Sequence, residues 1–146
     1  MDKNAYDKLF TLDKVLNRPR VRLAGINEQK CYFAHGLFDV NKKFTVIMNC
    51  KGHKKKKLSL MIRSSDGGNM MRFDIIGKSH HGYATPHLHI FNSENIFDCE
   101  FIEKSSLPFP LGRISNDFLD FQKDLEIFFI YNKVKLDNVV FVEEGE

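Results

Sequence analysis

Four of the six histidines of this chain lie within eleven residues, in the segment SHHGYATPHLH at positions 79–89. Imidazole titrates close to neutral pH and is the commonest ligand of transition metals in proteins. A cluster this dense therefore predicts a site that does chemistry. The two kinds of site that fit it are a metal centre and a general acid–base pair.

The strand PHLHI and the earlier strand MMRFDII place four polar side chains by alternation. Successive side chains of a strand point to opposite faces, so His87 shares a face with His89, and Arg72 shares a face with Asp74. If the two strands pair antiparallel with Asp74 opposite His89, all four side chains lie on one face. A register slip of one residue would separate them.

Zinc takes three or four nitrogen, sulfur or oxygen ligands at about 2.0 to 2.3 Å. We expect one zinc ion per chain, bound by His80, His87 and His89 with Asp74 as the fourth ligand. His81 is the alternative to His80 in the loop. Iron, nickel and copper also bind imidazole, whereas magnesium and calcium prefer oxygen ligands. The sequence therefore predicts a transition-metal site, with zinc as the expected ion.

A catalytic use of the same residues is the alternative interpretation. Two of the histidines His80, His87 and His89 could act as general base and acid in phosphodiester cleavage, while Arg72 stabilises the developing negative charge. Arg72 and Asp74 could equally form a structural ion pair. The alternative function is thus a small toxin-like nuclease, metal-dependent or using two histidines, that acts on RNA or DNA. Because neither a nucleophile nor a carboxylate pair is evident, we favour a protein that is not an enzyme.

The three cysteines predict no disulfide framework, because they are odd in number and widely spaced. Cys50 and His53 have the spacing of a zinc knuckle, but the surrounding lysines disfavour a divalent cation. We expect Cys31 and Cys99 to be small buried residues. Cys99 could reach the histidine site only if the chain folds back on itself.

The net charge of +3 comes from one short segment, KGHKKKK. Its lysines are Lys51, Lys54, Lys55, Lys56 and Lys57, and without these five the chain would carry −2. A lysine run of this kind predicts a solvated surface loop, with a weak nucleic-acid contact as the minority interpretation. An RNA-binding accessory protein that uses this loop is a third function to consider.

Two segments predict amphipathic helices. Three leucines at helical spacing predict the first over residues 6–17, ending before Pro19. The second is predicted over 115–134, with Ser115 or Asn116 as its cap and an aromatic face packed on a sheet.

Short segments rich in β-branched and aromatic residues, bounded by turn residues, predict strands. The segments are VRLAG, CYFAHGLFDV, FTVIMNC, LSLMIRSS, MMRFDIIG, PHLHIFN and an edge strand in NVVFVEEGE. Their short connections suit antiparallel neighbours. We therefore expect an α+β fold, an antiparallel sheet flanked by an N-terminal and a C-terminal helix.

The whole chain, residues 1–146, fits a single domain with one core, since 42% of its residues are hydrophobic. We expect a cytoplasmic protein without membrane contact, because we find neither a signal peptide nor a spanning segment.

The segment MRFDIIGKSHHGYATPHLHIFNSE resembles an uncharacterised family of small bacterial and prophage proteins. In that family a strand bearing Arg-x-Asp-x-x-Gly-x-x-His leads through a variable loop into Pro-His-Leu-His-Ile. The matching positions here are Arg72, Asp74, Gly77 and His80, followed by 86–90. The loop of this chain is shorter than the family pattern and contains the additional histidine at position 81.

The size of the chain and its histidine-rich segment also resemble the zinc-containing type II anti-CRISPR proteins of phages. These small inhibitors bind the RNA-guided effector nuclease and keep target DNA out. This resemblance implies a structural zinc ion and a phage-derived inhibitor whose partner is a bacterial CRISPR effector nuclease in the host-cell cytoplasm. The protein would then bind the effector through its surface and block target-DNA loading or cleavage, and complementary charge would steer the association.

Overall fold

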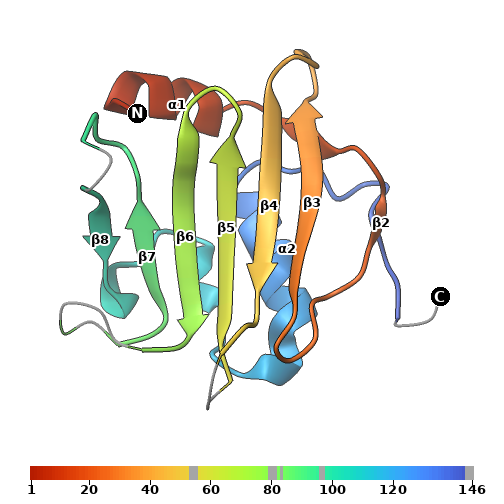
Figure 1. Ribbon diagram of the computed structural model, residues 1–146, viewed down its shortest axis with the longest axis vertical. Coiled ribbons are helices and arrows are strands. Elements are labelled where there is room, and N and C mark those ends of the chain that lie inside the picture. Colours follow the sequence, from red (N-terminus) through yellow and green to blue (C-terminus); the bar gives the residue numbers. More distant parts are fainter. Residues whose placement is uncertain (53–55, 79–81, 83, 96–97, 144–146) are drawn as a thin grey trace.

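The computed structural model describes residues 1–146 apart from 53–55, 79–81, 83, 96–97 and 144–146. Its main element is an antiparallel sheet of seven strands (Figure 1), with the spatial order β1-β3-β4-β5-β6-β7-β8. The strands are β1 (Lys14–Leu16), β3 (Gln29–Gly36), β4 (Lys43–Asn49), β5 (Leu58–Ser64), β6 (Gly68–Ile76), β7 (His87–Ile90) and β8 (Glu100–Ile102).

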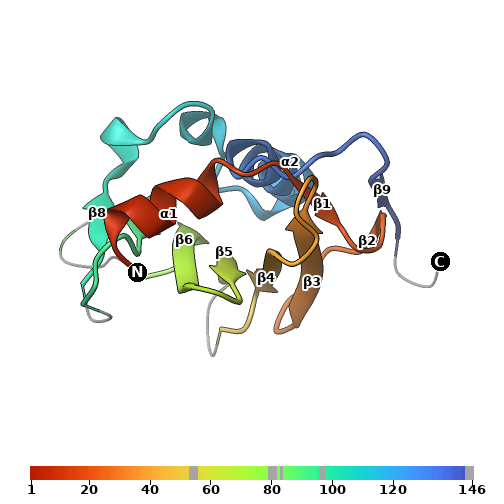
Figure 2. The same cartoon turned by 90° about the horizontal axis from the view of Figure 1, so that it is seen from above.

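Two α-helices, α1 (Lys3–Phe10) and α2 (Phe121–Tyr131), lie on the same face of this sheet (Figure 2). One is near each end of the chain, so the expected α+β fold with two helices and an antiparallel sheet is confirmed. The opposite face of β3, β4 and β5 is turned toward the viewer in Figure 1, and no helix of the described residues covers it. We call this second face the open face.

Alternation along the strands explains why the helices cover only one face. Phe44, Val46 and Met48 of β4 are fully or almost fully buried, whereas the residues between them are only half-buried. On α2 the aromatic stripe expected from the sequence, including Phe128 and Phe129, is buried against the sheet side of the molecule. Burying apolar side chains is the main favourable contribution to folding, so these two patterns fix which faces meet.

Three short 3₁₀ helices follow β8, at Lys104–Ser106, Leu111–Arg113 and Phe118–Asp120. Outside the large sheet, β2 (Arg20–Val21) pairs in parallel with β9 (Val140–Phe141). Within the described residues, no helix has the length and apolar character that crossing a bilayer requires.

The first helix is shorter than the sequence predicted. It ends at Phe10, with Thr11 as its C-cap, and Leu16 lies in β1 rather than in the helix. Val15 of β1 pairs with His35 of β3, so pairing with the sheet edge outweighs the helical spacing of the leucines.

The predicted start of the second helix is also wrong. The α-helix begins at Phe121, and neither Ser115 nor Asn116 caps it. Asp117 instead caps the preceding 3₁₀ turn by accepting a hydrogen bond from the Leu119 N–H.

Candidate metal centre

The pairing of β6 with β7 brings the four expected side chains onto one face. Asp74 lies opposite His87, and Arg72 lies opposite His89. The register considered from the sequence, with Asp74 opposite His89, is thus displaced by two residues. Because side chains alternate with a period of two, this shift leaves every side chain on its expected face.

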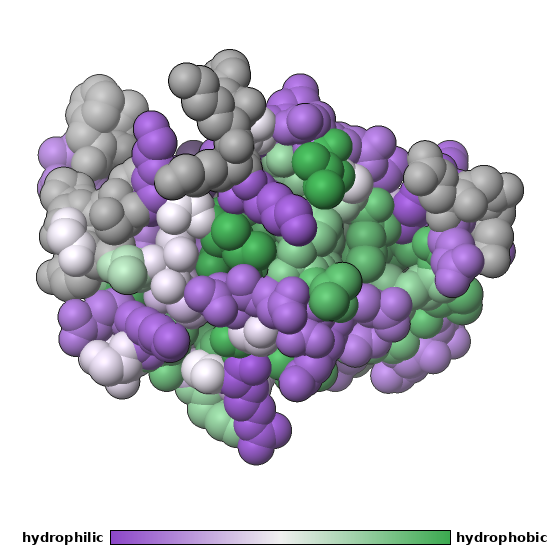
Figure 3. Space-filling model, turned by 90° about the horizontal axis from the view of Figure 1, so that it is seen from below, coloured by the Kyte–Doolittle hydropathy of each residue, from purple (hydrophilic) through white to green (hydrophobic). Residues whose placement is uncertain are grey.

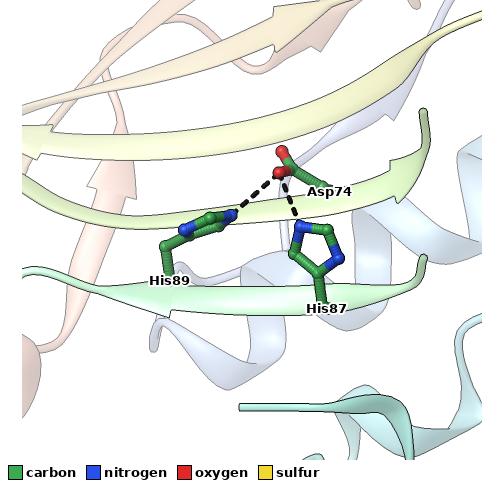
Figure 4. Close-up of side chains that lie close together, drawn as sticks. All are labelled: Asp74, His87 and His89. Atoms are coloured by element: carbon green, nitrogen blue, oxygen red, sulfur yellow. Dashed lines mark hydrogen bonds and ion pairs between the residues drawn. The ribbon is translucent and has the colours of Figure 1, made fainter. Parts of the chain in front are cut away.

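One carboxylate oxygen of Asp74 lies within hydrogen-bond distance of both histidines (Figure 4). Its Oδ2 lies 3.0 Å from Nε2 of His87 and 2.9 Å from Nε2 of His89. Among the described residues these three side chains form a group whose ligand atoms all lie within 4.8 Å of one another. Their exposed fractions are only 7%, 0% and 3%, so the group is buried.

Both nitrogens of the His87 ring face oxygens that can only accept a hydrogen bond. Nδ1 lies 3.2 Å from the backbone carbonyl oxygen of Ala84, and Nε2 lies 3.0 Å from Oδ2 of Asp74. A neutral imidazole carries one N–H and donates to only one of them. A histidine whose Nδ1 donates to a carbonyl keeps Nε2 as the nitrogen that can bind a metal.

Arg72 completes the surroundings of the carboxylate. Its Nε lies 3.0 Å from Oδ1 of Asp74, and its Nη2 lies 3.2 Å from Oδ2. Nη2 is also 3.0 Å from Nε2 of His89. The structural ion pair considered from the sequence is therefore present, and it is part of the same site.

The pKa of Asp74 reflects opposing effects. Burial raises it, but the hydrogen bonds from His89 and Arg72 and the charge of Arg72 hold the pKa well below its usual value. Asp74 is thus ionised at neutral pH, as a metal ligand must be.

Cys99 contacts the site, which the sequence analysis considered only for a chain that folds back. The strand β8, which was not predicted, runs beside β7 (Figure 1). It brings Cys99 Sγ to 3.7 Å from Nδ1 of His89, and the Phe101 ring to 4.4 Å from the His89 ring between centroids. Burial raises the pKa of the Cys99 thiol, and the charge of Arg72 partly offsets this. Cys99 and Phe101 therefore both pack against the His89 ring.

The other two cysteines lie elsewhere. Cys31 is exposed, so the prediction that it is buried was wrong. Cys50 is buried, its Sγ lies 3.8 Å from the Ala24 carbonyl oxygen, and burial raises the pKa of its thiol to about 11. His53, its partner in the knuckle-like spacing, lies outside the described residues.

Several expected residues cannot be placed against the site. His80 and His81 lie outside the described residues, so the loop ligand stays a prediction. The same holds for Lys54 and Lys55.

The described lysines of that segment are accessible. Lys51 and Lys56 are exposed and Lys57 is half-buried. Figure 3 shows hydrophobic side chains (green) in several patches, with hydrophilic side chains (purple) between and around them. An exposed position is what a solvated surface loop requires.

The donor set determines what the site can bind. Two imidazoles and one carboxylate suit zinc, and they also suit iron and other imidazole-binding metals. Both donor strands lie inside the sheet, between β5 and β8, so the ligand atoms are held by backbone pairing on each side.

No family model matches this chain, and no curated protein or solved structure matches it significantly. The argument for function therefore rests on the geometry of this site.

Proposed function

We propose that this protein binds one zinc ion through Asp74, His87 and His89, and that the ion has a structural role. The observation that carries the proposal is that acceptor oxygens lie beside both nitrogens of the His87 ring. Nδ1 lies 3.2 Å from the Ala84 carbonyl oxygen, and Nε2 lies 3.0 Å from the Asp74 carboxylate. A metal ion bound by Nε2 and the carboxylate lets Nδ1 donate to the carbonyl, which satisfies all three groups.

Burial supports a structural role over a catalytic one. His87 is fully buried and His89 is 3% exposed, so a polymeric phosphate has no access to either ring in this conformation. A structural zinc site is closed by four protein ligands, whereas a catalytic site keeps one position for water or substrate. We propose that a histidine of the 77–86 connection, His80 by preference over His81, supplies the fourth ligand. The ion would then tie this connection to β6 and β7.

The first test is metal content and metal-dependent stability. Tag-free protein should contain about one zinc per chain by plasma mass spectrometry, and chelator should lower its melting temperature. A ligand at a hundred times its dissociation constant stabilises a protein by about 2.7 kcal/mol, which is several degrees for a domain of this size.

The variants for this test are the double change His87→Ala/His89→Ala and the single change His35→Ala. The double variant should lose the zinc and the effect of the chelator. His35→Ala is the matched control, because His35 lies on the same face but bonds to Asn17 instead. Wild-type protein that is free of metal and insensitive to chelator would refute the proposal, as would a double variant that keeps its zinc.

We further propose that the protein acts as an inhibitor that binds a bacterial CRISPR effector nuclease. The resemblances in sequence support this role, and the burial of Asp74, His87 and His89 is consistent with a protein that does not turn over substrate. The test is cleavage of target DNA by a purified type II effector with increasing amounts of this protein. If the protein neither co-elutes with the effector nor inhibits it at a tenfold excess, the inhibitor role is refuted. The zinc proposal would be unaffected by that result.

One observation favours the second candidate function, a metal-dependent nuclease acting on RNA or DNA. Arg72 lies beside both Asp74 and His89, where a cation could stabilise negative charge on a phosphate. The zinc-loaded protein should then cleave an oligonucleotide, and His87→Ala should abolish the cleavage. Zinc-loaded protein without such activity would leave the structural role as the function of the site.

A further inference from the structure

The open face of the sheet carries an exposed aromatic ring between polar neighbours. Phe33 of β3 pairs with Thr45 of β4, and Thr45 pairs with Arg63 of β5. These three side chains therefore lie side by side on one face of the sheet, and because the alternating Ala34 and Phe44 are buried, that face is the open face. Phe33 is 61% exposed although it lies in the middle of a sheet strand. An exposed aromatic residue at such a position is available to a ligand.

The same region is hollowed. A hollow of about 550 Å³ is lined by Phe33, Thr45 and Arg63 and also by His35, Val40 and Lys43. No Asp or Glu is among the described residues that line it. The hollow therefore combines an aromatic surface with two cationic side chains and no negative charge of its own.

The two cations of the hollow are available for a new contact. Within the described part of the chain, no carboxylate oxygen lies within 4.0 Å of a side-chain nitrogen of Lys43 or Arg63. Their neighbour Lys42 differs, because its Nζ lies 2.7 Å from Oδ2 of Asp66. Lys43 and Arg63 are both exposed, so a bound anion could reach them directly.

The connection between β3 and β4 adds apolar surface. Val40, which lines the hollow, is 64% exposed, and Phe38 of the same connection is 89% exposed. Bases stack on aromatic side chains with little dependence on sequence, and phosphates take Lys and Arg as partners.

We propose that this hollow binds single-stranded nucleic acid, with one base stacked on Phe33 and neighbouring phosphates held by Lys43 and Arg63. The site is separate from the zinc site and does not depend on it. A protein segment could also cover exposed apolar residues. Two cationic side chains in a lining without carboxylates favour a polyanion over an apolar protein segment, because only the polyanion has charges complementary to the lining.

The experiment measures binding of fluorescein-labelled twelve-residue oligonucleotides, oligo(U) and oligo(dT), by fluorescence anisotropy over a range of salt concentrations. Wild-type protein should bind at least one of the two, and the two probes separate RNA from DNA as the ligand. Phe33→Ala should weaken binding at least fivefold, the lower range of measured losses for one base stack.

The charge variants test the phosphate contacts. The double variant Lys43→Gln/Arg63→Gln should reduce the slope of log K against log salt by about 1.4, because each contact to a single strand contributes about 0.7. Lys42→Gln is the matched control on the same hairpin and should leave the slope unchanged. Phe33 is mostly exposed, so circular dichroism and melting should be the same for Phe33→Ala as for the wild type.

Three results would overturn the proposal. The first is absence of binding to both probes at low salt. The second is binding that survives Phe33→Ala but is lost in Lys56→Gln/Lys57→Gln, which would assign the contact to the lysine segment. The third is a wild-type dimer in sedimentation that Phe33→Ala converts to monomer, which would make a second copy of this chain the occupant.

Discussion

Asp124 provides a pH-dependent prediction that can be worked out from the structure. The residue lies in the first turn of α2 and is fully buried. Its Oδ1 accepts a hydrogen bond of 3.3 Å from the Ser115 N–H, whereas Oδ2 has no hydrogen-bond partner among the described residues. Burial, partly offset by the bond from Ser115, raises the pKa of Asp124 from 3.8 to about 6. A buried carboxylate with one unsatisfied oxygen is unfavourable when ionised.

The magnitude follows from the difference between the folded and unfolded pKa values. A shift of one pKa unit corresponds to 1.36 kcal/mol, so this shift corresponds to at most about 3 kcal/mol. Because the folded pKa is the higher one, the protonated carboxyl stabilises the fold fully below about pH 4. That stability is lost as the pH rises through about 6, and the loss is nearly complete at pH 8.

Asp124→Asn removes this titration while keeping an oxygen for the Ser115 N–H. We expect the variant to gain stability relative to the wild type as the pH rises from 4 to 8, by about 2 to 3 kcal/mol. The assay is urea unfolding of both proteins at several pH values, since other groups titrate equally in both. Glu126→Gln, a partly exposed position on the same helix, is the control and should show a much smaller trend. A stability difference that is constant with pH, or that has the opposite sign, would refute the reasoning.

Two further predictions concern the framework of the fold. Lys14 is fully buried and its Nζ donates to three backbone carbonyls, so Lys14→Met should destabilise the protein by about 3 kcal/mol or more in urea unfolding. Lys135→Met, which removes only a partly exposed ion pair of 3.7 Å, should change stability by less than about 1 kcal/mol, and equal losses for the two lysines would contradict this. Gly36→Ala should cost about 1 to 3 kcal/mol, because a Cβ there would lie 2.6 Å from the backbone oxygen of Asp39. Gly77→Ala meets no atom within 4 Å and should be nearly neutral, so a larger loss at Gly77 than at Gly36 would show that the contact is not the cause.

The sequence alone determined which side chains of the candidate site share a face. His87 and His89 are two residues apart in one strand, as are Arg72 and Asp74 in another. The alternation of side chains is a local property of the extended backbone, so it needs no knowledge of the rest of the fold. Residue type and turn signals predicted most strands of the large sheet, although not β1 or β8, and helical spacing predicted the aromatic stripe of α2. Alternation also kept the site intact when the expected register proved to be displaced by two residues.

Only the tertiary structure decided which residues meet across the sheet. The approach of Cys99 to His89 depends on β8 returning beside β7, and nothing in the local sequence of Glu100–Ile102 fixes that return. Leu16 was predicted as helical because its spacing fits a helix, yet it pairs in β1. Likewise, the hollow beside Phe33 exists because both described α-helices pack on the other face of the sheet. In each case the deciding free energy comes from pairing and burial between segments distant in sequence, which residue spacing alone does not contain.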